Sequence, residues 1–418
     1  MTLDPVHVDG IAQLAGRVSE DVADSDHGEV ADRAWAEFLD PLYDDTGSVV
    51  LDPLDGIERQ KVPVDDIALT DTAFDTQHGL DAGTINPTTF KNGLVLDVSQ
   101  AAMAAVPSDV ELHRGRTIVM TVHTNDPSIS TYDDEWHGGD SGFARRRMLQ
   151  VPRVDQYEQT VVHALALYLA ESEHALKQAE VVEDLLVLDG PIYPTGLLKW
   201  RERNPELRRL LADEDMPRDV ICNYVELVET FVERDVPMVG FVKNSASKAI
   251  TRILRKKLGA PWVDDDAFFR RVLERLDDHG DPKTDHLTFT NWFRSRVGTD
   301  GMLCDGSLDI DHDRTLDEEA YEVTFFVVYD PRDDLVYRVE APYAFTRDEE
   351  LRAQLTTHLL SEVAGERGPP LPVGKADELA RIDRQGKQTL RRRIEREFDT
   401  SQQRSYNDKR WNAVEELL

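Results

Sequence analysis

Apolar runs of strand length alternate with amphipathic helical patterns from residue 91 onward. The strand-like runs cover residues 94–99, 116–123, 184–190 and 236–243, followed by a hairpin of residues 321–329 and 334–342. Helical spacing fills the intervals at residues 155–180, 218–234, 246–258, 264–277 and 347–363. Because near-continuous runs of Val, Leu and Ile are typical of strands covered on both faces, the pattern predicts an α/β domain with a sheet flanked by helices.

The remaining segments carry weaker patterns. Residues 1–90 begin with two helix-like patterns and continue as a stretch rich in Asp, Thr, Gly and Pro, which indicates short strands and loops. Residues 278–320 are polar and Asp-rich, so we expect a surface excursion there. The chain therefore divides into an N-terminal helical arm with an irregular segment (1–90), a core (91–385) and a C-terminal helical tail (386–418).

Charge is the strongest signal in the composition. The chain has 81 Asp and Glu against 48 Lys and Arg, a formal net charge of -33. Such a surface repels nucleic acid at low salt, but in molar salt the Debye length falls to about 3 Å and only contacting charges matter. The acids are spread along the whole chain, which favours a halophilic protein over one with a single acidic tail. An acidic protein of an ordinary cytoplasm is the alternative.

Cysteine usage and the terminal sequence limit the compartment. Cys222 and Cys304 form no CxxC pair, so structural zinc is disfavoured and a reducing compartment is expected. The N-terminus lacks a basic segment followed by an apolar one, and no stretch approaches 18 apolar residues. We expect a cytoplasmic protein with no membrane segment. Neither a GxxxxGK[ST] nor a GxSxG motif occurs, which argues against ATP hydrolysis and serine-based catalysis.

Two of the expected strands carry an aspartate near their ends. Asp97 lies in LVLDVS, and Asp189 lies in LLVLDGP before a Gly-Pro turn. Carboxyl ends of strands form the sheet edge at which α/β proteins bind ligands. A buried carboxylate without a partner is costly, and a divalent cation that prefers oxygen ligands, magnesium or manganese, offsets this cost. The alternative is that each aspartate only caps a turn or helix.

A third carboxylate is expected from the helix of residues 155–180. Glu171 and Glu173 lie on the two flanks of its apolar stripe. Periodicity does not choose between them, and a solvated glutamate on a helix surface is the alternative for either one.

The order of several sequence blocks resembles the NurA family of DNA double-strand-break repair nucleases, of the haloarchaeal type. The blocks are LVLDVSQAAMAAV, VVHALALYLAESEHALKQ, DLLVLDGPIYPTG, VPMVGFVKNSASKAI, YRVEAP and GPPLPVGKADELARI. The resemblance implies an RNase H-like mixed-sheet core flanked by helices, a manganese site that could also take magnesium, and a homodimer. It further implies 5'-3' exonuclease and endonuclease activity in DNA end resection, with a hexameric HerA-type ATPase as partner.

The family's functional positions are carried over one by one. Its first-strand aspartate falls on Asp97, its DG aspartate on Asp189, and its helix glutamate on Glu171 or Glu173, with Glu171 preferred. Where the family often has a histidine in the C-terminal block, this chain has Asp377, which could bind a metal but could not shuttle a proton as histidine does. The resemblance thus implies catalysis by Asp97, Glu171, Asp189 and Asp377, with Glu173 as a further candidate metal ligand. Carboxylates gather in this way where two cations bind the attacking and leaving oxygens of a phosphodiester.

Basic side chains follow one stripe of the helical pattern after VPMVGFVK, opposite apolar ones. The stripe consists of Lys248, Arg252, Arg255 and Lys256, and Lys243 ends the strand before it. These residues form a candidate DNA phosphate track. Arginine clusters also occur at residues 145–147 and 391–393. For each cluster the alternative is a solvated face paired with neighbouring acids.

The departures from the family pattern leave a second function open. The first-strand block reads DVS where family members often read DGS, and the family histidine is replaced. The chain is therefore either a manganese-dependent deoxyribonuclease or a non-catalytic DNA-end-binding adaptor of the ATPase that keeps the nuclease fold. A two-carboxylate glycosidase is less consistent, because aromatic residues make up only 7% of the chain and do not cluster.

Overall fold

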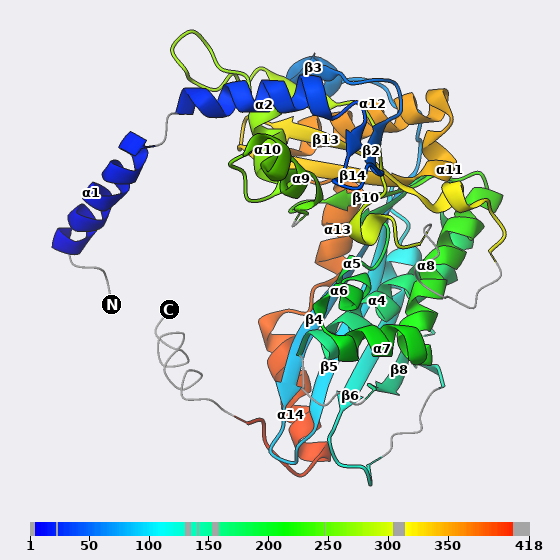
Figure 1. Cartoon of the computed structure of the whole chain (residues 1–418). Helices are drawn as coiled ribbons and strands as arrows, with labels where there is room; N and C mark the ends of the chain where they lie inside the picture. Colours follow the sequence, from blue (N-terminus) through cyan, green and yellow to red (C-terminus); the bar gives the residue numbers. More distant parts are fainter. Residues whose placement is uncertain are drawn as a thin grey trace. The chain divides into compact units, whose positions relative to one another are not determined.

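The computed structural model describes residues 5–21, 24–129, 135–139, 142–152, 159–245, 247–303 and 314–403. The chain forms two compact units, each assembled from separated stretches (Figure 1). Unit 1 contains Met1–Asp66, Lys243–Gly298 and Phe325–Arg338, and unit 2 contains Ile67–Val242, Thr299–Thr324 and Val339–Leu418. Strands β13 (Val323–Asp330) and β14 (Leu335–Pro342) run through both units.

Unit 2 is built on a mixed sheet. Its strands are β4 (Gln77–Thr89), β5 (Val95–Val106), β6 (Arg116–His123), β7 (His137–Gly138), β8 (Ala144–Gln150), β9 (Leu186–Asp189) and β10 (Met238–Val242), in the order β10-β9-β4-β5-β6-β8-β7. Strand β9 is parallel to both β10 and β4, whereas β5 is antiparallel to both β4 and β6. The expected α/β fold class, with a mixed sheet flanked by helices, is confirmed.

Helices cover this sheet and complete the core of unit 2. They are α4 (Gln159–Gln178), α5 (Thr195–Leu198), α6 (Trp200–Arg203), α7 (Pro205–Asp213), α8 (Asp215–Glu233), α11 (Tyr343–Thr346), α12 (Glu349–Glu366), α13 (Leu371–Ala380) and α14 (Arg384–Glu397). Helix α4 packs against β4, β5, β6 and α8, and α13 packs against β4 and β5 (Figure 1). The apolar stripe of α4 forms because Val161, Leu165 and Leu169 recur at helical spacing and are buried.

Unit 1 has its own apolar core. Its elements are α1 (Pro5–Asp21), α2 (Asp24–Phe38), β1 (Leu42–Tyr43), β2 (Val49–Pro53), β3 (Arg59–Pro63), α9 (Ala249–Leu258), α10 (Asp265–Leu273), β11 (His286–Thr290) and β12 (Phe293–Ser295), and α3 (Val64–Ile67) follows β3. The expectation of a surface excursion at residues 278–320 is wrong for β11 and β12, because Leu287, Phe289 and Phe293 are buried. Strand β11 pairs with β3 and β13.

Most strand and helix positions follow the sequence pattern, with one large exception. Strand β6 begins and ends where the pattern places it, but β4 occupies 13 residues of a segment that the pattern assigns to short strands and loops. Helix α14 accounts for part of the expected C-terminal tail, and residues 404–418 lie outside the described residues. Within the described residues, no helix combines the length and the apolar composition needed to cross a membrane.

Candidate metal centre

Two aspartates lie side by side on neighbouring strands of unit 2. Strands β4 and β9 are parallel, and Leu80 is in register with Leu188. The next residues along the two strands are Asp81 and Asp189, and neighbouring strands lie about 4.8 Å apart. Asp189 is a residue that the sequence singles out, whereas Asp81 is not. The signal for Asp81 was present in the segment GLDAG, where small residues surround a single carboxylate on a strand.

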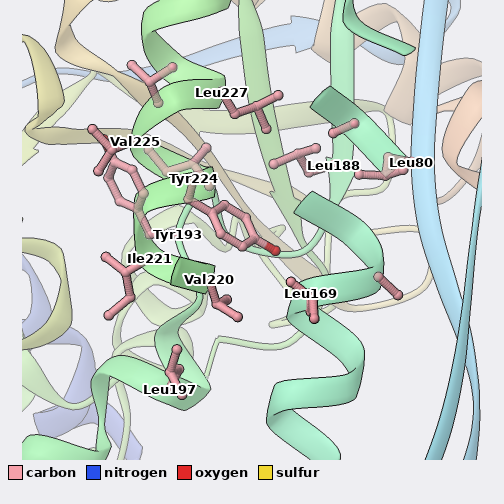
Figure 2. Close-up of a cluster of buried hydrophobic side chains, with 14 of the residues drawn as sticks. Leu80, Leu169, Leu188, Tyr193, Leu197, Val220, Ile221, Tyr224, Val225 and Leu227 are labelled. Atoms are coloured by element: carbon pink, nitrogen blue, oxygen red, sulfur yellow. The ribbon is translucent and has the colours of Figure 1, made fainter. Parts of the chain in front are cut away.

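Helix α4 adds Glu171 to this region. Glu171 and Asp189 line a cavity of about 120 Å³, together with Leu80, Leu167, Tyr168, Leu188, Pro191 and Tyr224. The Tyr224 hydroxyl donates a hydrogen bond of 3.1 Å to Glu171 Oε2. Figure 2 shows Tyr224 among the buried side chains of Leu80, Leu169 and Leu188, which come from β4, α4 and β9. A mostly apolar cavity with two carboxylates in its lining thus lies beside β4 and the end of β9.

The charges of Asp81 and Asp189 affect the ionisation of Glu171. The pKa of Glu171 is raised to about 8, first by burial and then by the negative charges of Asp81 and Asp189, while the hydrogen bond from Tyr224 opposes the rise. Glu171 therefore shares a partly buried cavity with Asp189 and is also affected by the negative charge of Asp81 on the neighbouring strand. Two like charges near a third disfavour its ionisation, and a cation bound among them would reverse the effect.

The turn after Asp189 is fixed by close backbone packing. Gly190 has a positive φ of 135°, which a residue with a side chain rarely adopts. On β10, a Cβ at Gly240 would lie 2.5 Å from the Gly190 carbonyl oxygen, so only glycine allows this approach. The Ile192 amide donates a 3.2 Å hydrogen bond to the buried carboxylate of Glu340. These contacts hold Asp189 at the mouth of the pocket.

Helix α13 lies along β4 in direct backbone contact. A Cβ at Gly79 would lie 2.2 Å from the Pro372 carbonyl, and a Cβ at Gly83 would lie 2.2 Å from the Ala380 oxygen. Asp81 lies between these two points on the strand. Asp377 is also on α13, but its side chain is 47% exposed and Asp377 Oδ2 forms an ion pair of 3.4 Å with Arg381.

Asp97 lies elsewhere on the sheet, and the expectation that it meets Glu171 and Asp189 is not what the structure shows. Asp81 is opposite Ala102 on β5, five residues from Asp97, which corresponds to about 17 Å along a strand. The reason is strand direction and length: β5 is antiparallel to β4 and continues to Val106, so Asp97 is near its amino end. Asp97 is fully buried, and its Oδ2 lies 3.0 Å from His163 Nδ1.

The structure also separates the two glutamates of α4. Glu171 faces the carboxylate pocket, whereas Glu173 Oε2 forms an ion pair of 3.2 Å with Arg145 Nη2 on β8. The structure thus places Glu171 near Asp189 and Glu173 beside Arg145, and the assignment of either glutamate as a metal ligand stays a prediction.

The expected basic stripe lies in unit 1 on α9. Its apolar side is buried, with Ile250, Ile253 and Leu254 in the core of that unit. Lys248, Arg252, Arg255 and Lys256 are exposed, and Lys243 is partly exposed. Lys256 Nζ forms an ion pair of 2.6 Å with Asp45, so the paired, solvated alternative applies to this residue.

The donor set near Asp189 fits a hard divalent cation, although its geometry is open. Among the described residues, no group of three or more His, Cys, Asp or Glu side chains is arranged to hold a metal ion as the structure stands. Asp81, Glu171 and Asp189 nonetheless supply the oxygen ligands that magnesium and manganese prefer. A bound cation would reduce the electrostatic repulsion among these carboxylates.

Fold and site together define an α/β protein whose mixed sheet carries Asp81 within β4 and Asp189 at the end of the neighbouring parallel strand β9, with Glu171 on the helix beside them. A model of the NurA domain matches residues 75–382, well over half of the chain, and the chain belongs to this family. The match begins two residues before β4 and so includes Asp81.

Solved structures of NurA proteins are similar to this chain at low sequence identity. The NurA nuclease from Sulfolobus solfataricus is 13% identical, with 95% of this chain and 98% of that chain covered and a TM-score of 0.46. A NurA structure bound to dAMP and manganese is 11% identical, with 94% and 97% covered and a TM-score of 0.43. A NurA structure with manganese is 10% identical, with 78% and 89% covered and a TM-score of 0.38. No curated protein matches the chain.

Proposed function

We propose that this NurA-family protein is a divalent-metal-dependent nuclease that hydrolyses DNA, with Asp81, Glu171 and Asp189 as its metal ligands. One observation carries the proposal: Glu171 and Asp189 line the same cavity, and Asp81 directly follows Leu80, which also lines that cavity and is in register with Leu188. Three oxygen donors from two strands and one helix thus share a region with excess negative charge. A polyanionic substrate would not approach this region without a cation.

The chain's own residues prepare the site. Tyr224 donates to Glu171 and fixes the orientation of its carboxylate. The Gly190 turn and the buried Glu340 hold the segment that follows Asp189. When bound, a divalent cation supplies charge stabilisation at the phosphate and lowers the pKa of a coordinated water. Asp81, Glu171 and Asp189 would hold this cation, and Glu171 would release its proton on binding.

Asp377 and Asp97 take different places in this proposal. Asp377, on the helix that lies along β4, is a fourth candidate ligand once its ion pair with Arg381 opens. We assign no metal to Asp97, because its side chain contacts His163 and because it lies five residues along β5 from Ala102, the residue opposite Asp81. We assign the family's first-strand role to Asp81 instead.

The identity of the metal, the cleavage activities and the partners are further proposals, based on membership of the NurA family. Manganese is our choice of metal, since a similar NurA structure is described as bound to dAMP and manganese. The exonuclease and endonuclease activities, the role in end resection, the HerA-type ATPase partner, the homodimer, the cytoplasmic location and the salt adaptation follow from the sequence and stay predictions. Exposed Lys248, Arg252 and Arg255 are proposed to contact DNA phosphates.

The test compares the nuclease activity of variants at the two proposed aspartate ligands, Asp81 and Asp189, with that of a variant at Asp97. Purified full-length protein in concentrated potassium chloride with manganese should degrade linear DNA, and Asp81→Asn or Asp189→Asn should lower the rate by at least about a hundredfold. Asp97→Asn is the matched control: it should keep most of the activity, because Asp97 contacts His163 and lies about 17 Å along the sheet from the position opposite Asp81. Circular dichroism checks the folding of each variant.

Two outcomes would contradict the proposal. Full activity of Asp81→Asn together with loss of activity in Asp97→Asn would return the role to Asp97. Binding of DNA by the wild-type protein without any degradation would favour the non-catalytic adaptor, which the open ligand geometry keeps as the second candidate.

A further inference from the structure

A cluster of basic side chains gathers at the far side of the same sheet, in unit 2. It contains Arg114, Arg116, Arg145, Arg147 and Lys177, which come from the end of a 3-10 turn (Leu112–Arg114), β6, β8 and the last turn of α4. We call it the β8 basic cluster. In a chain with a net charge of -33, such a concentration of positive charge is an exception.

The positive field of this cluster is visible in its neighbours. The pKa of His174 is lowered to about 3, first by burial and then by the positive charges of Arg145, Arg116 and Lys177. Burial also lowers the pKa of Arg145, against the opposing effect of Glu173. Glu173 forms its ion pair with Arg145, and we expect the five neighbouring cations together to attract an anion.

Arg145 is held rigidly and organises the cluster. Its Nη2 contacts both the carboxylate and the main-chain oxygen of Glu173, and its Nε donates a 3.2 Å hydrogen bond to Thr117 Oγ1. Thr117 Oγ1 in turn lies 3.0 Å from His174 Nδ1. A fixed guanidinium loses little side-chain entropy when it binds an anion.

Aromatic rings are interleaved with these cations. The Arg145 and Arg147 guanidinium carbons lie 4.1 Å and 5.7 Å from the ring centroid of Trp136. The exposed Arg114 lies 3.8 Å from the ring centroid of Phe143. Alternating cations and aromatic rings are typical of surfaces that bind single-stranded nucleic acid, where phosphates meet the cations and unpaired bases stack on flat groups.

The cluster lies in one transverse row of the sheet with the carboxylates. Asp81 on β4 is opposite Ala102 on β5, the adjacent Ala101 is opposite Thr117 on β6, and Thr117 is in register with Arg145 on β8. At about 4.8 Å per strand, the backbone of β8 lies about 15 Å from that of β4. Helix α4 borders both places, since Glu171 faces the acids and Glu173 faces Arg145.

We infer that the β8 basic cluster binds a single-stranded segment of DNA a few nucleotides away from the phosphodiester that the carboxylates cleave. The inference rests on the proposed nuclease function and adds a substrate subsite to it. The commitment to a single strand follows from the aromatic rings, because paired bases in a duplex expose no face for stacking.

The test measures binding without cleavage. A fluorescent oligothymidylate is titrated with full-length protein in EDTA across a series of potassium chloride concentrations, and anisotropy gives Kd. The double variant Arg114→Gln/Lys177→Gln removes two exposed charges and leaves the organising Arg145 in place. We expect Kd to rise at least about tenfold, and the slope of log Kd against log salt to fall by about 1.4, since each phosphate contact on a single strand contributes about 0.7.

The matched control removes the same charge from other exposed positions, as Arg209→Gln/Lys283→Gln, and should leave Kd and slope unchanged. Arg114→Lys should restore most of the lost affinity. Equal binding by the double variant and the control would overturn the inference, as would an absence of binding by the wild-type protein. An equal loss of affinity for a blunt duplex would overturn the assignment to a single strand.

The design separates this inference from the proposed function. If the wild-type protein and Asp189→Asn bind the oligonucleotide alike and neither cleaves it with manganese, the subsite stands and the nuclease proposal fails. If the wild-type protein cleaves DNA and the double variant binds and cleaves as the control does, the subsite fails and the nuclease proposal stands.

Discussion

The raised pKa of Glu171 gives a quantitative prediction for the metal-free protein. A shift from the ordinary value of 4.5 to about 8 is equivalent to about 5 kcal/mol. Because the carboxyl keeps some contact with solvent, screening reduces this, and we expect about 2–3 kcal/mol. Between pH 4.5 and pH 8 the native state holds a proton on Glu171 that the unfolded state has lost. The free energy of unfolding therefore falls as pH rises, by at most about 1.4 kcal/mol per pH unit, and it levels off above pH 8.

Glu171→Gln removes this pH-dependent loss, because glutamine stays neutral. We expect the variant and the wild-type protein to have similar free energies of unfolding near pH 5 in EDTA, and the variant to be more stable by about 2–3 kcal/mol at pH 9. Urea denaturation followed by tryptophan fluorescence measures the difference at each pH. Glu173→Gln on the same helix is the matched control, because its carboxylate faces Arg145 and not other acids.

A flat difference between Glu171→Gln and the wild-type protein from pH 5 to pH 9 would refute the reasoning. Addition of manganese provides a second check, because metal binding requires the ionised glutamate. Manganese should stabilise the wild-type protein increasingly as pH rises toward 8, and should stabilise the glutamine variant much less. The same stabilisation of both proteins would place the metal elsewhere.

Three further predictions concern packing, hydrogen bonding and DNA contact. Gly79→Ala should lower the free energy of unfolding by about 2–3 kcal/mol, because the added Cβ would meet the Pro372 carbonyl. Gly374→Ala, in open space on α13, should raise the free energy of unfolding by about 0.5–1 kcal/mol. Thermal denaturation of the two variants measures both changes. Tyr224→Phe removes a hydrogen bond that favours the ionised glutamate, so manganese affinity at pH 7, measured by calorimetry, should fall about tenfold. Arg252→Gln/Arg255→Gln should make the salt slope of duplex binding shallower by about 1.8, and an unchanged slope would remove α9 from the DNA-binding surface.

The sequence pattern places many of the elements because their residues agree locally with their environment. Strand β6 follows from alternating and β-branched residues, and α4 follows from a stripe of Val, Leu and Ala at helical spacing. Strand β4 is missed because its residues are unusual for a strand: Gly79 and Gly83 have low strand propensity, and both are present because α13 touches the backbone there. That contact is with residues nearly 300 positions away, which a local pattern does not contain.

The site shows the same division between local and long-range information. Asp189 is found because it ends a short buried strand, and Glu171 is found as one of two helix positions. Asp97 resembles Asp189 in its local sequence, but only the direction and length of β5 reveal that it lies at the other end of the sheet. The compact units also combine separated stretches of the chain, whereas a division by sequence follows the chain in order.

The central claim is that Asp81, Glu171 and Asp189 share a metal ion. The most direct measurement is a crystal structure of the full-length protein with manganese, with anomalous diffraction recorded at the manganese absorption edge. The account predicts a peak bound by oxygens of these three carboxylates at about 2.0–2.3 Å. A peak beside Asp97 and His163, or no peak near Asp189 at saturating manganese, would contradict it.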